Sequence, residues 1–256
     1  HSLSPFIHSR FSRNENVNIN YLAYKVSNDD FHIFIKEFFQ DKEARGLNIT
    51  LPHKKRAAKI EGMVSQEAQY INAVNTIVNK DKMLHLFSTD GVGFINDIEN
   101  KKFNLKNKNI LIIGAGAAVE SILYRVAKAK PKKITITNRT PEKADRLIRK
   151  FSNMTKIISE VDLEEPFDLV INGSSAGLTG EFLPEENITT TTQTHFYDLN
   201  YSLTETPFCK WANEKSENVY DGMGMLVYQA AHSFEKWFNI FPNTDKVIND
   251  LEEMRE

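Results

Sequence analysis

The sequence predicts an α/β protein: an N-terminal α/β unit, then a Rossmann-like, doubly wound parallel sheet, then C-terminal helices that return to the first unit. From residue 110 onward, strand-like apolar runs alternate with helical stretches, a pattern typical of a parallel sheet. The passage ILIIGAGAAVES at 110–121 joins an apolar strand to a helix through glycines. The 256 residues also exceed the roughly 250 at which single cores usually split, so we expect two domains.

The first ninety residues are expected to form one α/β unit. From Asp29 to Asp41 apolar side chains recur at helical spacing, which predicts an amphipathic helix packed on a core. This apolar stripe comprises Phe31, Phe34, Ile35, Phe38 and Phe39. Strand-like runs follow at 47–50, 73–78 and 83–87, and the segment HKKRAAKIEGM at 53–63 is expected to be helical.

A polar, lysine- and asparagine-rich passage at 99–109 interrupts the apolar pattern, and we expect a hinge near it. The strand-like runs beyond it lie at 110–113, 133–137, 168–171, 195–199 and 218–220. Two helices are expected at the end, over 224–238 and 243–256, and the last would place Val247, Ile248, Leu251 and Met254 on one face. The predicted division is residues 1–92 with 225–256 in one domain and 93–224 in the other.

The composition is that of an ordinary globular protein. Hydrophobic residues make up 41% of the chain, and the formal net charge of -2 leaves no broad basic field for nucleic acid. No apolar stretch approaches the roughly 20 residues that span a bilayer, and we expect no secretory signal. The single cysteine, Cys209, favours a reducing, cytoplasmic setting and excludes a cysteine-based metal site. We therefore expect a small-molecule ligand, no metal, and neither nucleic acid nor membrane as partner.

The glycines after the first strand of the second half predict a dinucleotide site. A pyrophosphate needs a tight turn, a close backbone approach and the positive end of a helix, which Gly114, Gly116 and the following amides would supply. A second strand about twenty residues later strengthens this interpretation. The third position of the fingerprint is Val119 instead of glycine or alanine, which questions the packing of the helix more than phosphate binding.

The end of the second strand indicates which dinucleotide binds. NAD-specific proteins usually present Asp or Glu there to the ribose hydroxyls, whereas this chain has Asn138-Arg139-Thr140, with Lys143 one turn on. A guanidinium can grip a 2′-phosphate bidentately and stack on adenine. The residues therefore favour NADP, and the alternative is a solvated basic turn.

Three polar residues of the first half stand out by their positions. Lys54 follows Pro52 where a strand ends, Asn75 lies inside the apolar run AVNTI, and Asp90 precedes Gly91 ahead of the expected hinge. By themselves these residues have ordinary interpretations, because lysines are usually solvated and Asn or Asp in turns is usually structural.

Eight segments place these residues in one pattern. In order they are HSLSP, NITLPHK, AVNTI, STDGVGF, GAGAA, NRT, YDLNYSLTETPF and DGMGMLVYQAA. Together they resemble the shikimate dehydrogenase family, an NADP-dependent shikimate 5-dehydrogenase family, over almost the whole chain. The resemblance implies a shikimate-binding catalytic domain, a Rossmann domain for NADP, and reversible reduction of 3-dehydroshikimate to shikimate in the pathway to chorismate and aromatic amino acids.

The resemblance also implies roles for individual residues. The substrate would contact Ser2, Ser4, Thr50, Lys54, Asn75, Asp90, Tyr201 and Gln229. Lys54 and Asp90 would form the catalytic pair, and neither His1 nor His53 is assigned a catalytic role. The NADP site would be lined by Gly114, Ala115, Gly116, Ala117, Ala118, Asn138, Arg139, Thr140, Lys143, Leu199 and Gly222.

The chain departs from the family pattern in two places. The family usually has Gly-Ala-Gly-Gly-Ala where this chain has GAGAA, so one amide would approach the pyrophosphate less closely. Family members also begin with a strand before the serine motif, so we expect the start of the sequence to be missing. Without that strand Ser2 would lie on a frayed end.

Competing interpretations remain open from the sequence. A Lys54 ammonium can donate the proton to the carbonyl oxygen that gains charge as hydride arrives, while Asp90 holds the lysine. Oxidation of shikimate needs neutral lysine and should favour alkaline pH. A quinate/shikimate dehydrogenase and a non-catalytic nucleotide-binding regulatory module are the alternatives, and the chain could be a monomer or a homodimer.

Overall fold

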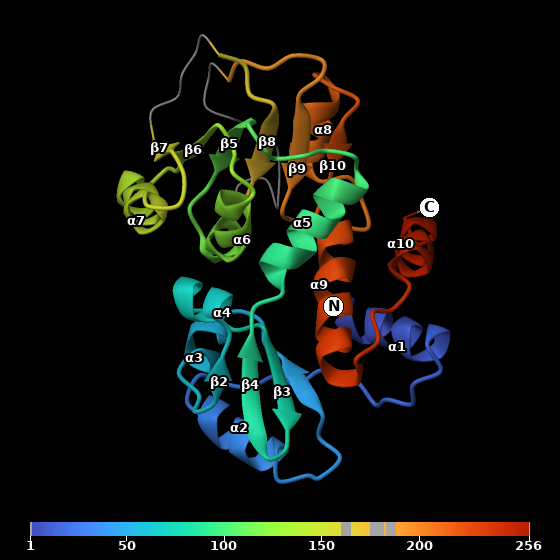
Figure 1. The fold of residues 1–256 in the computed structure, drawn as a ribbon. Coiled ribbons are helices and arrows are strands. Elements are labelled where there is room, and N and C mark those ends of the chain that lie inside the picture. The colour runs from blue at the N-terminus through green and yellow to red at the C-terminus, as the bar shows by residue number, and fades with distance from the viewer. Residues whose placement is uncertain (1, 160–164, 175–181, 183–187, 256) are drawn as a thin grey trace. The chain divides into compact units, whose positions relative to one another are not determined.

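The computed structural model describes residues 2–159, 165–174, 182 and 188–255, and it divides into two compact units (Figure 1). The first unit contains the chain up to Gly93 together with Val227–Asp250, and the second contains Phe94–Leu226 with the chain from Leu251. Helices α5 (Asp90–Asn100) and α9 (Met223–Phe238) each contribute residues to both units. The predicted α/β class with a Rossmann-like sheet is confirmed.

The first unit is built on a small mixed sheet. Its strands are β1 (Gly46–Asn48), β2 (Met63–Val64), β3 (Thr76–Lys80) and β4 (Met83–Phe87), in the spatial order β1-β3-β4-β2. Strands β1, β3 and β4 are antiparallel neighbours, whereas β2 runs parallel to β4. The helices of this part of the chain are α1 (Ser4–Asn14), α2 (Phe31–Phe38), α3 (Lys54–Ala57) and α4 (Gln66–Ile71).

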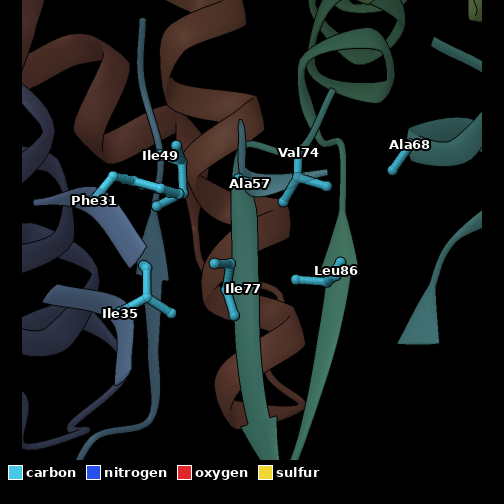
Figure 2. Packing of buried hydrophobic residues seen from close by; sticks show 8 residues of the cluster. All are labelled: Phe31, Ile35, Ile49, Ala57, Ala68, Val74, Ile77 and Leu86. Atoms are coloured by element: carbon cyan, nitrogen blue, oxygen red, sulfur yellow. The ribbon is translucent and has the colours of Figure 1, made fainter. Parts of the chain in front are cut away.

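Only part of the apolar stripe predicted between Asp29 and Asp41 is buried in the core of the first unit. Phe31 and Ile35 of α2 are buried at 2% and 5% exposure, and they cluster with strand residues such as Ile77 and Leu86 (Figure 2). The other three aromatic residues of the stripe, Phe34, Phe38 and Phe39, are only partly buried. The buried face of α2 is therefore narrower than the sequence predicts.

The predicted helix over 53–63 is much shorter in the structure. Helix α3 ends at Ala57, and the chain then turns through a bond from Ile60 N to Ala57 O. Met63 and Val64 leave the helical path because they pair with His85 and Leu86 of β4. Strand pairing at the sheet edge thus replaces the last two helical turns.

The second unit has a six-stranded sheet in the order β10-β9-β8-β5-β6-β7, and every adjacent pair in it is parallel. The strands are β5 (Asn109–Ile113), β6 (Lys133–Thr137), β7 (Ile157–Ile158), β8 (Leu169–Asn172), β9 (His195–Asp198) and β10 (Val219–Tyr220). The helices between them are α6 (Ala117–Lys128), α7 (Pro141–Phe151) and α8 (Pro207–Asn213). The predicted parallel, doubly wound sheet is confirmed.

The strand order reverses between β5 and β8. From β5 the chain proceeds outward to β6 and β7, then returns to β8 on the other side. Ligands of open α/β sheets bind beyond the carboxyl ends of the strands at such a switch point. The loops after β5 and β8 are therefore the first place to look for a nucleotide site.

The last helix, α10 (Thr244–Glu253), follows the predicted pattern at two of its four apolar positions. Val247 and Leu251 are fully buried, whereas Met254 is 44% exposed because the helix ends before it. Within the part of the chain that the structure describes, no helix combines the length and apolarity needed to cross a membrane.

Candidate active site and nucleotide site

A lysine–carboxylate pair lies in the first unit at the starts of two helices. Lys54 is the first residue of α3 and Asp90 the first of α5, and Nζ of the lysine is 2.7 Å from Oδ2 of the aspartate. The Asp90 side chain is 8% exposed and that of Lys54 22%. A carboxylate this buried needs a charged or hydrogen-bonded partner, and the lysine supplies one while its ammonium keeps access to solvent.

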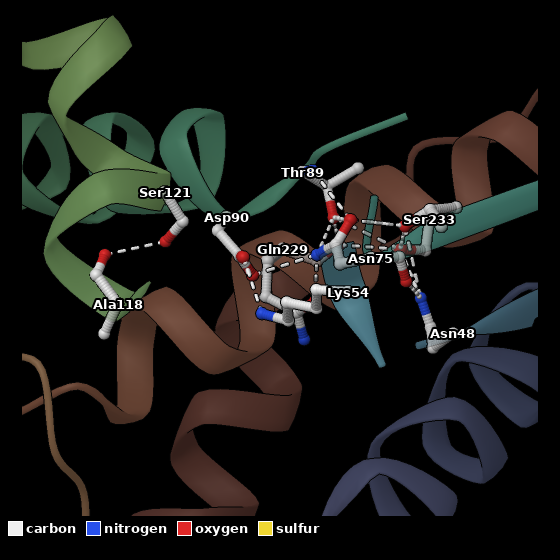
Figure 3. A network of polar contacts seen from close by, with 10 residues as sticks. Asn48, Lys54, Asn75, Thr89, Asp90, Ala118, Ser121, Gln229 and Ser233 are labelled. Carbon is white, nitrogen blue, oxygen red and sulfur yellow. Dashed lines mark hydrogen bonds and ion pairs between the residues drawn. The ribbon is translucent and has the colours of Figure 1, made fainter. Parts of the chain in front are cut away.

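Asn75 holds the second oxygen of the same carboxylate. Its Nδ2 donates to Oδ1 of Asp90 at 2.9 Å, and its Oδ1 accepts the backbone N–H of Thr89 at 2.8 Å. Because a backbone N–H can only donate, this contact fixes which end of the amide faces the carboxylate. Both Asp90 oxygens are therefore held, one by the amide and one by Lys54 (Figure 3).

Gln229 of α9 joins this network at two points. Its side-chain Oε1 accepts from Asn75 Nδ2 at 3.3 Å, and its backbone carbonyl accepts from Thr89 Oγ1 at 3.0 Å. Close helix packing makes this possible, since a Cβ on Gly93 of α5 would lie 2.7 Å from the Gln229 backbone nitrogen. The structure thus brings together four of the predicted residues, Lys54, Asn75, Asp90 and Gln229.

The other predicted substrate contacts, Ser2, Ser4, Thr50 and Tyr201, are exposed or partly exposed. Ser2 is exposed, and its hydroxyl accepts the Ser4 N–H at 3.3 Å where α1 begins. Thr50 is exposed just before α3. Tyr201 belongs to the second unit and is 39% exposed, and desolvation raises the pKa of its hydroxyl.

Of the two histidines without an assigned catalytic role, His53 has a structural environment. Its Nε2 is 2.9 Å from the Val26 carbonyl, and its ring stacks on Phe31 with centroids 4.7 Å apart. His1 lies outside the described residues.

Sequence reasoning missed several polar residues of the network. Ser233 lies one turn after Gln229 and is fully buried, and Asn48 donates to its Oγ at 2.9 Å. Thr76 and Thr89 are also buried and contact Asn75. Asn48 and Thr89 lie inside the motifs NITLPHK and STDGVGF, so the motif boundaries were a usable signal. Ser233 offered none, because a serine inside an apolar helix pattern is usually unremarkable.

The glycine loop after β5 has the geometry of a phosphate cradle. Gly114 adopts φ +106°, and a Cβ there would lie 2.9 Å from the backbone of Gly173. Gly116 is the N-cap of α6 without any side-chain cap, and a Cβ on it would meet nothing within 4 Å except Gly173 O at 4.0 Å. Gly116, Ala117 and Ala118 are exposed at the helix N-terminus, where backbone amides favour an anion. The loop therefore fits a dinucleotide pyrophosphate.

Val119 is accommodated by a glycine on the neighbouring strand connection. The valine is fully buried, and a Cβ on Gly173 would lie 2.2 Å from its Cγ2. The small residue that the fingerprint places on the helix is here on the loop after β8. Helix α6 therefore packs on the sheet despite the departure at Val119.

The turn after β6 is tied to the glycine loop through Asn138. Its Oδ1 accepts the Ala115 N–H at 3.0 Å, and its Nδ2 donates to the Thr140 carbonyl at 2.8 Å. The predicted phosphate ligands Arg139, Thr140 and Lys143 are exposed around this turn. Glu142 shares the first turn of α7, so the turn is not purely basic. An exposed guanidinium at this place suits a 2′-phosphate.

A second glycine contact shapes the end of β9. A Cβ on Gly222 would lie 2.6 Å from the Leu199 carbonyl oxygen, and the Gly222 N–H donates to Asn200 O at 2.9 Å. Beside this segment Asp198, 2% exposed, accepts hydrogen bonds from Asn172 Nδ2 at 2.9 Å and Thr206 Oγ1 at 2.8 Å. Its pKa is raised because burial outweighs these bonds. The predicted positions Leu199 and Gly222 thus belong to one closely packed segment.

A parallel sheet with this phosphate loop, and a separate α/β unit that carries a lysine–carboxylate pair, define a two-domain nicotinamide-dependent dehydrogenase. Among the residues that the structure describes, no group of three or more His, Cys, Asp or Glu side chains could hold a metal ion.

Comparisons with known proteins identify the family. Family models match at residues 1–77 (shikimate dehydrogenase substrate binding domain), 97–196 (shikimate / quinate 5-dehydrogenase) and 222–252 (shikimate 5'-dehydrogenase C-terminal domain). A shikimate dehydrogenase (NADP(+)) of Legionella pneumophila is 39% identical over 256 residues, which covers 98% of this chain and 94% of the relative. The chain belongs to the shikimate dehydrogenase family.

Solved structures agree with this assignment. An Ael1 enzyme from Pseudomonas putida superposes with a TM-score of 0.88 at 34% identity, covering 98% of this chain and 94% of that chain. Shikimate 5-dehydrogenase from Thermus thermophilus, solved with NADP(H) and shikimate, gives a TM-score of 0.87 at 29% identity, covering 99% and 95%.

Proposed function

We propose that this protein catalyses the reversible, NADPH-dependent reduction of 3-dehydroshikimate to shikimate. The observation that carries this function is the Lys54–Asp90 pair at 2.7 Å, in a chain that is similar over 98% of its length to a shikimate dehydrogenase (NADP(+)). The product is an intermediate on the way to chorismate and the aromatic amino acids. Quinate is the second candidate substrate, because the family model over 97–196 is described as shikimate / quinate 5-dehydrogenase.

The cofactor is NADP, and it supplies the hydride when bound. The residues that would hold its pyrophosphate are Gly114 to Ala118, whose amides lie at the open N-terminus of α6. Asn138, Arg139, Thr140 and Lys143 would hold the adenosine 2′-phosphate, with Leu199 and Gly222 lining the remainder of the site. The exposed Arg139 and the absence of Asp or Glu at 138–140 support this assignment.

Lys54 manages the proton in this mechanism. As the carbonyl carbon is reduced, its oxygen gains negative charge, and the Lys54 ammonium stabilises that charge and donates a proton to it. Asp90 keeps the ammonium in place through Oδ2, and Asn75 prevents the carboxylate from turning by binding Oδ1. Reduction thus needs charged lysine at the start, and oxidation of shikimate needs it neutral.

Hydroxyl and amide groups would bind the ring and carboxylate of the substrate. Asn75 and Gln229 lie beside the catalytic pair and present amide groups, which suit vicinal hydroxyls. The remaining proposed contacts are Ser2, Ser4, Thr50 and Tyr201. We further propose that residues 1–92 and 225–256 form the substrate domain and 93–224 the NADP domain. The two compact units support this division, although the chain from Leu251 groups with the second unit. A cytoplasmic monomer or homodimer completes the proposal.

NADPH consumption with 3-dehydroshikimate is the direct test, followed as the loss of the absorbance of the reduced nicotinamide. We expect turnover with 3-dehydroshikimate, and reduction of NADP by shikimate in the reverse direction. Quinate oxidation at a similar kcat/KM would identify a quinate/shikimate dehydrogenase. NADPH binding without turnover of either substrate would sink the enzymatic function and leave a regulatory module.

A further inference from the structure

Tyr21 lies in a segment without helix or strand, yet its side chain is held on several sides. The segment 17–27 connects α1 to the turn before α2. The Tyr21 ring stacks on His8 of α1 with centroids 4.2 Å apart and an interplanar angle of 13°. The ring of Trp237, which belongs to α9, lies with its centroid 6.2 Å from that of the Tyr21 ring. The Tyr21 ring thereby anchors this irregular segment to α1 and α9.

The phenol hydroxyl is directed at Asn48 of β1. Tyr21 Oη donates to Asn48 Oδ1 at 2.9 Å. The opposite end of the same amide, Nδ2, donates to the Asn75 carbonyl at 3.2 Å and to Ser233 Oγ at 2.9 Å. The hydroxyl therefore selects the orientation in which Asn48 can donate to the residue that holds Asp90 (Figure 3).

The Tyr21 ring also contacts the helix that carries Ser4, because His8 lies one turn after Ser4 in α1. Desolvation raises the pKa of the Tyr21 hydroxyl to about 12, so the phenol stays protonated over the working pH range and can donate to Asn48. One side chain thus contacts both the helix that begins at Ser4 and the amide network around Asn75.

We infer that Tyr21 is a positioning residue that fixes the Asn48 amide beside Asn75 through its hydroxyl. This inference rests on the proposed function, in which Asn75 contacts the substrate. The need for such a residue follows from the fold, because Tyr21 lies in an irregular segment, Asn48 ends β1 and Asn75 precedes β3. Substrate affinity depends on keeping such groups within a fraction of an ångström.

The variant Tyr21→Phe removes the hydroxyl and keeps the ring that stacks on His8. Losing one neutral hydrogen bond costs about 0.5–1.5 kcal/mol, so we expect KM for shikimate to rise roughly 2- to 12-fold. kcat should change less than about twofold, and the NADPH dissociation constant should not move, because Tyr21 touches neither the proposed proton donor nor the nucleotide loop. Tyr24→Phe is the matched control, since Tyr24 is 53% exposed and contacts Phe34 through its ring.

A double-mutant cycle separates positioning from general stability. If Tyr21 acts through Asn48, Asn48→Ala should raise KM for shikimate by itself, and the Tyr21→Phe effect on KM should shrink to less than about twofold in the Asn48→Ala background. Fully additive effects, an unchanged KM in Tyr21→Phe, or an equal rise in Tyr24→Phe would each overturn the inference. Wild-type enzyme assayed in parallel distinguishes failure of the proposed function from failure of this inference. An inactive wild type would reject both. An active wild type with an unaffected Tyr21→Phe variant would reject the inference alone.

Discussion

The ammonium of Lys54 lies 2.7 Å from one carboxylate oxygen of Asp90, and the other oxygen of that carboxylate accepts from Asn75. The two residues begin different helices, so neither can shift without disturbing the strand connections before it. Backbone bonding adds to this, because the Lys54 carbonyl accepts the Val74 N–H at 3.0 Å. The proton donor and its carboxylate partner are therefore placed by the fold itself.

Replacing Lys54 by alanine should lower kcat by roughly 10²- to 10⁴-fold, the usual range for losing a positioned general acid or base. KM should change much less, since the proposed substrate contacts Asn75 and Gln229 remain. Steady-state kinetics with 3-dehydroshikimate would measure both. Lys59→Ala is a suitable control, because Lys59 is exposed a short distance along the chain. A Lys54→Ala enzyme that keeps more than half of normal kcat would remove this lysine from the mechanism.

Arg139→Ala should weaken NADPH use and leave NADH use nearly unchanged. Only NADPH carries a 2′-phosphate for the guanidinium, and Arg139 is exposed beside Asn138 at the turn after β6. Titrations of both dinucleotides would test this, with Arg149→Ala on α7 as the exposed control. Equal losses for NADPH and NADH would mean that Arg139 acts on adenine or on the fold.

The two glycines of the phosphate loop should respond differently to alanine. Gly114→Ala should lower the free energy of unfolding by at least about 1–2 kcal/mol, because φ is +106° and the added Cβ would press on Gly173. Gly116→Ala meets no such obstacle within the protein, since its φ is −85° and only Gly173 O lies as near as 4.0 Å. We expect it to leave the unfolding free energy almost unchanged and to weaken NADPH binding, because a methyl group would enter the proposed pyrophosphate site.

Denaturant unfolding and NADPH titration on both variants check this pair. The interpretation of the loop would be wrong if Gly116→Ala unfolded as easily as Gly114→Ala while binding NADPH normally.

The sequence predicted the second unit better than the first, for a physical reason. Strands such as β5 and β6 are buried on both faces, so they appear as continuous apolar runs with clear ends. The first unit depends on short pieces, including the two-residue strand β2, whose existence rests on pairing with β4 and not on local preference. Helix α1 was not predicted either, because its sequence SPFIHSRFSRN has few apolar positions at regular spacing.

The site was predictable only in part. Lys54 and Asp90 are far apart in the chain, and their pairing was expected from the family resemblance, not from local pattern. Buried polar residues such as Ser233 and Asn48 have no sequence signature of their own, because their burial depends on partners elsewhere. The packing of Val119 was equally hidden from the sequence, because the space for its side chain comes from Gly173 on another strand connection.

A last prediction concerns His8, whose imidazole is fully buried among the rings of Phe11, Tyr21, Phe234 and Trp237. Burial lowers its pKa from 6.5 to about 3, and a smaller contribution from Asn48 acts the other way. Between these two values the unfolded chain binds a proton that the folded protein does not. Stability contributed by neutral His8 is therefore complete above pH 6.5 and is lost as the pH falls toward 3.

Once His8 is fully protonated in the unfolded chain, the free energy of unfolding should fall by about 1.4 kcal/mol for each pH unit of acidification because of this residue. Denaturant unfolding of wild type and His8→Leu at several values between pH 7 and about 4.5 would isolate it, because other titrating groups, Asp97 and Asp198 included, cancel in the difference. Leucine has a similar size and cannot be protonated, so the variant should lose less stability on acidification than wild type whatever its stability at pH 7. His32→Gln provides the control, since His32 is exposed. Parallel wild-type and His8→Leu curves would show that the His8 ring gains access to a proton without unfolding, and the neutral, sealed environment assigned to it would be wrong.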